Sequence, residues 1–351
     1  MTFNLDKLVR ENVKNLVPYS SARKEFAGAA EIFLDANENS FGSPTEKSFN
    51  RYPDPLQTKI KERIAGSHDL SPEHIFIGNG SDEAIDLLFR VFCQPGNDEI
   101  ITTPPTYGMY EVSANINDVR VKKVLLSPDF ELSAEKVLDA VSENTKLIFL
   151  CSPNNPTGNS LKRQEVLRIL EKFCGIVVVD EAYADFSDKP SFVREIKNFP
   201  NLVVLQTFSK AWGLAGLRVG MAFANAEIIS LLNKVKPPYN VSQIAQETLL
   251  AALDKKAEVE KVVAEIVRQR VGLAEELQNF SFVRRIYPSD ANFLLVKTSD
   301  ANRIYKYLIE QKIVVRNRTN VELCAGCLRI TIGTTEENRI LLSALSGYEN
   351  N

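Results

Sequence analysis

The chain has very few histidines: His68 and His74 are the only two among 351 residues. Catalysis by a serine or cysteine nucleophile commonly needs a histidine beside it, and a multi-histidine metal centre needs several. His74 directly precedes the apolar run IFIG (75–78), so we expect it to flank a strand. The sequence therefore predicts chemistry that uses another proton carrier, and it predicts no metal site.

Cysteine is also scarce. The five cysteines are an odd number scattered along the chain, which is typical of reduced thiols rather than of a disulfide framework. Cys324 and Cys327 form one C-x-x-C pair, but no second pair or histidine completes a tetrahedral metal site. We favour packing as the role of these two residues, with a redox pair as the alternative.

Long apolar runs and a strong net charge are missing as well. No apolar run approaches the roughly 20 residues that span a bilayer, and the charged start MTFNLDKLVRENVKNL contains no signal-peptide core. The formal net charge of −3 provides no basic field for nucleic acid or anionic lipid. We therefore expect a cytoplasmic protein with neither nucleic acid nor membrane among its partners.

What the chain does have is a regular alternation of short apolar runs and helical patterns. The runs are almost continuously apolar, as in parallel strands covered on both faces. They lie at 74–78, 99–105, 146–153, 176–181, 202–207 and 219–224. Between them, apolar residues recur at helical spacing in 82–92, 161–173 and 226–235. This alternation predicts a doubly wound α/β fold with a mainly parallel central sheet.

The last third of the chain has a different pattern. A helical stretch from about 241 to 279 leads into strand-like and helical segments at 282–298, 301–311, 313–319 and 327–334, followed by a final helix. We expect a large domain at 31–260 and a smaller α+β domain at 261–351. An N-terminal arm at 1–30 is expected to join the small domain. Ligand sites commonly lie between such domains.

The segment GNGSDE (78–83) follows a predicted strand and opens a predicted helix. Its glycines let a ligand approach the backbone, and a helix N-terminus favours an anion such as phosphate. Ser81 and Asp82 could offer backbone N–H groups and a hydroxyl there, although Ser81 could also be only a helix cap. The third glycine of a dinucleotide fingerprint and a Walker lysine are both missing, which disfavours a nucleotide.

Lys210 is the residue around which the chemistry is organised. It stands in TFSKAWGLAGLRVG (207–220), directly after one strand-like run, while Asp180 ends the previous run and Tyr183 lies three residues later. Adjacent strand ends could bring these three side chains together. A lysine amine in desolvated or cationic surroundings forms Schiff bases with carbonyl compounds. Taken alone, Asp180 could be a turn residue and Lys210 a solvated surface lysine.

Other polar residues could complete a cofactor site. Arg218 could clamp a phosphate, with hydroxyl donors from Thr207 and Ser209. Asn155, in the loop SPNNPTG, could donate a hydrogen bond to a phenolic oxygen, and the ring of Tyr107 could stack on a pyridine face. The simpler interpretations are an ordinary loop for Asn155 and a core aromatic for Tyr107.

Two arginines mark the predicted small domain. Arg316 and Arg329 lie on or beside predicted strands, and arginine is suited to bidentate recognition of a carboxylate or phosphate. Surface ion pairs are the alternative. The apolar neighbours Leu328 and Ile330 indicate a half-buried strand, so that Arg329 is aimed at a specific partner.

Together these segments resemble the pyridoxal-phosphate-dependent aminotransferases of fold type I, and within them the histidinol-phosphate aminotransferases. The order and spacing of the motifs carry the resemblance, which covers almost the whole chain. The motifs are VPYSSAR (17–23), LDANENS (34–40), RYPDP (51–55), GNGSDE, PTYGMY, CSPNNPTG, DEAY, TFSKAWGLAGLRVG, SDANFLLV (289–296) and LRITIGT. One departure is NENS (37–40), where the family pattern would be NENP, and this puts the local geometry of the arm in doubt.

The resemblance implies a role for each matching residue. Lys210 would hold pyridoxal 5′-phosphate through a Schiff base, with Asp180 on the pyridine nitrogen and Tyr183 and Asn155 on the phenolic oxygen. The phosphate would be surrounded by Ser81, Asp82, Thr207, Ser209 and Arg218, and by Tyr52 of a second subunit. The substrate would be lined by Tyr19, Arg23, Tyr107, Asn155, Arg316 and Arg329.

The resemblance also implies substrates and an assembly. The substrates would be L-histidinol phosphate and 2-oxoglutarate, giving imidazole acetol phosphate and glutamate, and the assembly a homodimer with shared active sites. A phosphothreonine decarboxylase and an aromatic amino-acid aminotransferase of the same fold are the alternatives. A regulator with an aminotransferase-like sensor domain would need a basic DNA-binding module. The family pattern begins by about residue 17 and leaves no room for one.

Overall fold

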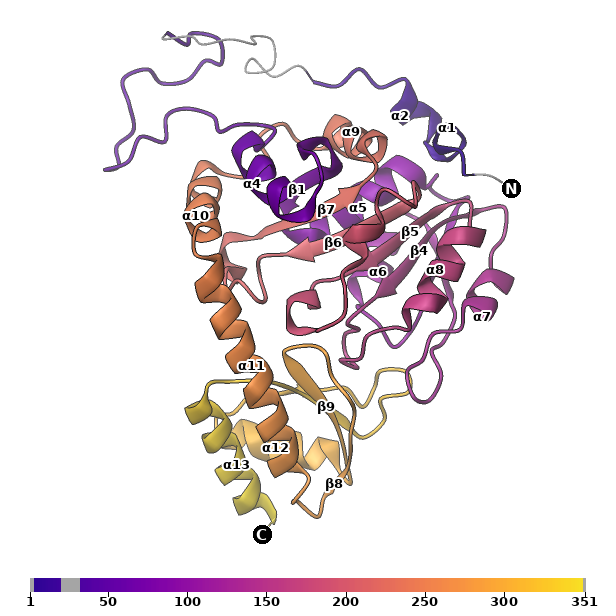
Figure 1. Ribbon diagram of the computed structural model, residues 1–351, viewed down its shortest axis with the longest axis vertical. Coiled ribbons are helices and arrows are strands. Elements are labelled where there is room, and N and C mark those ends of the chain that lie inside the picture. The colour runs from indigo at the N-terminus through magenta and orange to yellow at the C-terminus, as the bar shows by residue number, and fades with distance from the viewer. Residues whose placement is uncertain (1–2, 20–31, 350–351) are drawn as a thin grey trace.

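A computed structural model describes residues 3–19 and 32–349 of the chain. Two β-sheets organise these residues (Figure 1). The larger sheet has seven strands in the order β1-β7-β6-β5-β4-β2-β3, and the smaller has four in the order β10-β11-β9-β8. The architecture is α/β, with a mainly parallel central sheet and a smaller α+β part, as predicted.

The larger sheet is mainly parallel because β1, β2, β3, β4, β5 and β6 all run in one direction, and only β7, which lies between β1 and β6, runs antiparallel to its neighbours. Each apolar run contains one strand: β1 (Ile75–Asn79), β2 (Glu99–Thr102), β4 (Thr145–Cys151), β5 (Ile176–Asp180), β6 (Leu202–Thr207) and β7 (Val219–Ala224). The edge strand β3 (Arg120–Lys123) was not predicted, since it is polar and largely exposed.

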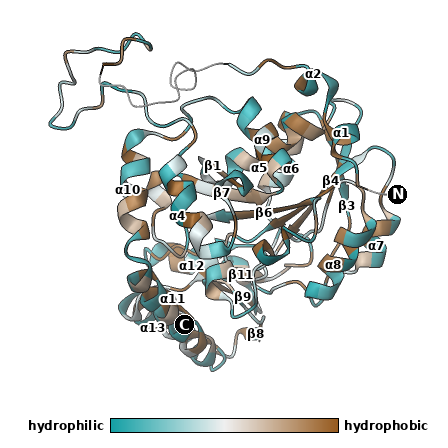
Figure 2. Cartoon of the chain, turned by 45° about the horizontal axis from the view of Figure 1, so that its top comes forward, coloured by the Kyte–Doolittle hydropathy of each residue, from teal (hydrophilic) through white to brown (hydrophobic). Residues whose placement is uncertain are grey.

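Helices cover both faces of this sheet and bury two separate apolar layers, so that its strands are among the most hydrophobic parts of the chain (Figure 2). One face is covered by α5 (Gly80–Phe92), α6 (Met109–Ile116) and α9 (Ala226–Val235). The other is covered by α4 (Thr58–His68), α7 (Ala134–Asp139), α8 (Arg163–Lys172) and α10 (Gln243–Leu253). Short 3-10 turns lie at Pro72–His74, Ala184–Phe186, Phe192–Glu195 and Ala215–Leu217.

The smaller sheet packs against three helices around a core of its own. The long helix α11 (Lys256–Leu277) leads from α10 down to this part of the molecule (Figure 1). The remaining elements are β8 (Val283–Ile286), β9 (Phe293–Thr298), α12 (Ala301–Glu310), β10 (Arg316–Asn317), β11 (Cys327–Thr331) and α13 (Thr335–Glu349). The expected domain boundaries at 31–260 and 261–351 stay a prediction.

The N-terminal helices α1 (Leu5–Leu8) and α2 (Glu11–Lys14) lie against the large sheet's helical layer. Val9 and Val13 are buried in the same apolar cluster as α5, and the backbone N–H of Arg10 donates to the carbonyl of Val91 at 3.0 Å. The expectation that the arm joins the small domain is therefore wrong for this part of it. Over the described residues, no helix combines the length and the hydropathy that a membrane crossing requires.

Candidate active site

A cavity of about 790 Å³ lies where the carboxyl ends of the large sheet's parallel strands face the edge of the smaller sheet. The carboxyl ends of parallel strands are the usual ligand site of open α/β sheets. The cavity is lined by most of the residues that the sequence singled out, which are Ser81, Asp82, Tyr107, Asn155, Asp180, Tyr183, Thr207, Ser209, Lys210, Arg218, Arg316 and Arg329.

Asp180 ends β5 at the floor of the cavity and is only 2% exposed. The Tyr110 hydroxyl donates to its carboxylate at 2.6 Å, and the backbone N–H of Ala182 donates at 3.1 Å. Burial raises the pKa of Asp180, and these two hydrogen bonds oppose that rise by favouring the ionised carboxylate. The site therefore holds a buried carboxylate with two hydrogen-bond donors among the residues that the structure describes.

Tyr110 is a residue that the sequence analysis missed. It lies on α6, fully buried, with its ring stacked on Phe149 at 4.7 Å between centroids. Burial, together with the negative charge of Asp180, raises its pKa, so its hydroxyl stays a proton donor. The motif PTYGMY contains two tyrosines, Tyr107 and Tyr110. The sequence did not show that the helix containing Tyr110 turns this side chain toward Asp180.

Lys210 stands in the turn after β6, and its side chain reaches the solvent-accessible part of the cavity. Its Nζ lies 5.6 Å from the centroid of the Tyr183 ring. Partial desolvation lowers the pKa of this amine, and the positive charges of Arg329 and Arg218 lower it further. A lysine whose uncharged form is favoured in this way is suited to attack a carbonyl carbon.

The N-terminus of α5 forms the anion-binding end of the cavity. No side chain caps this helix, which leaves the amides of its first turn to other partners. Gly80 has φ +71°, and a Cβ there would approach Arg218 Nη2 to 3.0 Å. Arg218 itself donates from Nη1 to Ser209 Oγ at 3.4 Å and lies 3.6 Å from Asp82. The uncapped amides, Arg218 and Ser209 together offer hydrogen-bond donors that can bind a phosphate.

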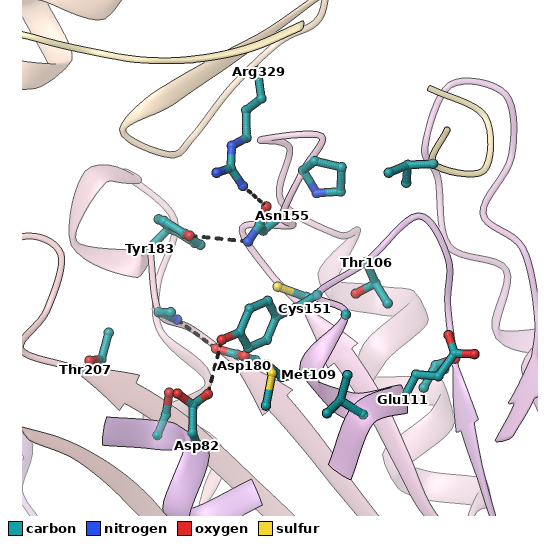
Figure 3. A pocket seen from close by; sticks show the side chains of 18 of the residues that line it. Asp82, Thr106, Met109, Glu111, Cys151, Asn155, Asp180, Tyr183, Thr207 and Arg329 are labelled. Carbon is teal, nitrogen blue, oxygen red and sulfur yellow. Dashed lines mark hydrogen bonds between the residues drawn. The ribbon is translucent and has the colours of Figure 1, made fainter. Parts of the chain in front are cut away.

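A chain of hydrogen bonds crosses from the large sheet to the small one (Figure 3). Asn155 Nδ2 donates to the Tyr183 hydroxyl at 3.4 Å, and Arg329 Nη1 donates to Asn155 Oδ1. Burial raises the pKa of Tyr183, while burial and the neighbouring Arg318 lower the pKa of Arg329 to about 10. At the opposite wall, the Tyr107 hydroxyl donates to Asp82 Oδ1 at 3.1 Å.

The small-domain wall of the cavity contains three arginines rather than the two that were predicted. Arg316 and Arg329 are directly opposed in the pairing of β10 with β11, and Arg318 follows two residues after Arg316. The R-x-R spacing was the signal that could have found Arg318. At the rim, Lys123 lies 2.9 Å from Glu111 and 3.4 Å from Glu322.

Two predicted site residues lie elsewhere. Tyr19 and Tyr52 line a separate, open hollow of about 1310 Å³, and the Tyr52 ring stacks on Tyr239 at 4.4 Å. The structure of a single chain therefore does not bring them to the cavity around Lys210. Arg23 lies outside the described residues.

Comparison with known proteins places the chain in a large group of enzymes. Residues 31–345 match the family model for aminotransferases of class I and II. A histidinol-phosphate aminotransferase of Parabacteroides distasonis is 56% identical over 99% of each chain. Another, of Cytophaga hutchinsonii, is 54% identical over 99% of this chain and 100% of that one.

Solved structures agree with these sequence matches. The histidinol-phosphate aminotransferase of Clostridium acetobutylicum superposes with a TM-score of 0.80 at 26% identity, covering 86% of this chain and 92% of that chain. The enzyme of Sinorhizobium meliloti, solved in complex with pyridoxal-5′-phosphate, superposes with a TM-score of 0.79 at 25% identity, covering 90% of each chain. The chain belongs to the class I and II aminotransferases and, within them, to the family of histidinol-phosphate aminotransferases.

Proposed function

We propose that this chain is a pyridoxal-phosphate-dependent aminotransferase that moves an amino group between L-histidinol phosphate and 2-oxoglutarate in histidine biosynthesis. The observation that carries the proposal is the cavity itself, in which Lys210 and the buried Asp180 lie between a phosphate cradle and an arginine-lined wall. Relatives of the same length that are more than half identical carry the same substrate in their names.

The residues present fit pyridoxal 5′-phosphate at both of its polar ends. The uncapped N-terminus of α5, with Arg218 and Ser209, would hold the phosphate. Asp180 would accept a hydrogen bond from the ring nitrogen, and Tyr183 and Asn155 would donate to the phenolic oxygen. When bound, the cofactor supplies an electron-withdrawing ring that acidifies the Cα–H bond of the bound amine.

The side chains of the cavity then supply proton transfer and positioning. Lys210 Nζ would link to the cofactor at rest and would afterwards carry the proton from the substrate Cα, because no histidine lines the cavity among the described residues. Asp180 would keep a proton on the ring nitrogen, provided that its carboxylate stays ionised. Tyr110 is the group that favours ionisation, through the 2.6 Å hydrogen bond.

The chemistry of the amino donor indicates which groups of the cavity anchor the substrate. Histidinol phosphate has no α-carboxylate, so its phosphate must supply the anchor, whereas glutamate offers carboxylates in the other half-reaction. Arginine can bind either group through paired N–H donors. Arg329 and Arg316, which are paired across β10 and β11, would serve both substrates.

The assembly would be a homodimer with shared active sites, in a reducing, cytoplasmic setting. Residues 32–50 project from the body of the molecule (Figure 1). They carry exposed apolar side chains, among them Leu34 at 83% and Phe41 at 102% exposure. Such side chains gain by burial against a second copy. Tyr52, together with Tyr19 and Arg23 of the arm, would then reach the partner's cavity. The five free cysteines are consistent with a reducing compartment.

The test is a single half-reaction. Purified protein loaded with pyridoxal 5′-phosphate is mixed with L-histidinol phosphate, and the absorbance is followed from the aldehyde to the amine form of the cofactor. A rapid change, reversed by 2-oxoglutarate, is expected. A change with phenylalanine alone, or release of CO₂ from phosphothreonine, would redirect the assignment to one of the two alternatives.

A further inference from the structure

Arg318 lines the cavity but has no role in the reaction proposed above. Its backbone N–H donates to the Cys327 carbonyl at 2.9 Å and so continues the pairing of β10 with β11. Residues two apart on a strand point to the same face, so Arg318 lies on the side of Arg316. Its side chain lines the cavity, and its Nε is buried without a hydrogen-bond partner.

The three arginines of this wall have no carboxylate partner in the part of the chain that the structure describes. Among residues 3–19 and 32–349, no acidic side chain forms an ion pair with Arg316, Arg318 or Arg329. The nearby acids of the cavity are already engaged: Glu111 and Glu322 with Lys123, and Asp82 with Arg218.

The arrangement is electrostatically unfavourable in the absence of a ligand. Like charges directly opposed across two strands destabilise a sheet, and Arg316 is directly opposed to Arg329. Burial and the neighbouring charge of Arg316 lower the pKa of Arg318. Arg329 also has a buried, unpartnered Nε. Buried donors of this kind are normally satisfied, so the wall is built for an anion that arrives from outside.

We propose that Arg318 is a third anion-binding arginine, which makes this wall select a doubly charged phosphate monoester over a carboxylate. The inference rests on the proposed function and specifies its substrate class. A phosphate monoester carries about −1.5 to −2 charges at pH 7 and three acceptor oxygens. A carboxylate carries one charge and two oxygens and is satisfied by one bidentate arginine. A third arginine therefore adds binding energy mainly for the phosphate.

The experiment compares two dead-end ligands that lack the reacting amine, 3-(imidazol-4-yl)propyl phosphate and 4-(imidazol-4-yl)butanoate. Calorimetry on the cofactor-loaded protein gives a Kd for each, and the half-reactions with L-histidinol phosphate and L-glutamate give KM and kcat. Arg318→Gln should raise the Kd and KM for the phosphate ligands about 10- to 150-fold, the range for one lost charge-assisted hydrogen bond. The carboxylate values and kcat should change far less.

Two further variants keep the result interpretable. Arg318→Lys retains the charge without the planar fork, and it should keep part of the preference for phosphate. Arg284→Gln removes the same charge from β8, outside the cavity, and should leave the preference unchanged. If Arg318→Gln loses its cofactor, the lysine variant decides the question.

The inference is overturned if both ligands weaken equally, if neither weakens, or if the wild-type protein does not prefer the phosphate ligand. Its failure is distinguishable from failure of the proposed function. A wild-type protein that does not react with L-histidinol phosphate contradicts the proposed function, while the ratio of the two calorimetric Kd values still decides whether Arg318 selects phosphate.

Discussion

Replacing Tyr110 by phenylalanine isolates the contribution of one hydrogen bond to the proposed chemistry. The change removes the hydroxyl that donates to Asp180 at 2.6 Å and keeps the ring that stacks on Phe149. Asp180 is left buried with the Ala182 N–H as its one remaining donor among the described residues. Because burial already raises the pKa of Asp180, loss of the opposing hydrogen bond must raise it further.

The size of the effect follows from the kind of bond that is lost. A hydrogen bond to a charged group contributes about 1.5–3 kcal/mol. If the capacity of Asp180 to keep the ring nitrogen protonated falls by this amount, the half-reaction slows about 10- to 150-fold, at 1.36 kcal/mol for each factor of ten. Cofactor affinity should fall as well, since the same carboxylate contacts the ring.

Two measurements test the Tyr110 prediction. Stopped-flow absorbance gives the rate of the half-reaction, and equilibrium titration of the cofactor-free protein gives the affinity for pyridoxal 5′-phosphate. Tyr287→Phe is the matched control, because Tyr287 is also buried but lies outside the cavity. A Tyr110→Phe protein whose rate and cofactor affinity both equal those of the control would refute the role given to the hydroxyl.

The remaining predictions concern the amine, the acid and the assembly. Lys210→Ala should abolish borohydride-dependent labelling by the cofactor, and persistent labelling would remove Lys210 from its role. Because desolvation lowers the pKa of Lys210, the uncharged amine forms at lower pH than for a free lysine. The rate of cofactor uptake should therefore rise with pH and level off below pH 10.5. A rate profile with its midpoint at or above pH 10.5 would contradict this prediction. Asp180→Ala should slow the half-reaction by several decades, whereas a rate near wild type would show that the reaction does not need the Asp180 carboxylate. Phe41→Asp should shift the proposed dimer toward monomer in light scattering, and a wild-type protein that is itself monomeric would contradict the proposed assembly.

The parallel strands were predictable because they are buried on both faces and therefore read as continuous apolar runs. The exposed edge strand β3, Arg120–Lys123, lacks that signal and was missed. The single helical stretch expected from about 241 is divided into α10 and α11 around residues 254–255. The described start of the N-terminal arm packs on the cluster around α5 and not on the small domain, because an amphipathic segment shows that it packs but not which element it packs against.

Most of the candidate site was predictable because its residues stand at the ends of strands, and parallel strands bring those ends to one edge. The sequence alone thus determined which chemical groups are present: one lysine, an acid, an amide, hydroxyls and arginines, with no histidine beside them. It could not determine which of these groups contact one another. Tyr110 contacts Asp180 across 70 positions of chain, and Arg329 contacts Asn155 across 174.

Those contacts, and the position of Arg318 beside two other arginines, were decided by tertiary structure alone. The strand register places Arg316 opposite Arg329, and the packing of α6 on the sheet turns Tyr110 toward the floor of the cavity. The physical reason is that local pattern specifies the type of an element and its buried face, whereas the distance between two charges depends on how separate elements pack. The pKa of Asp180 and the charge of the arginine wall both depend on such distances.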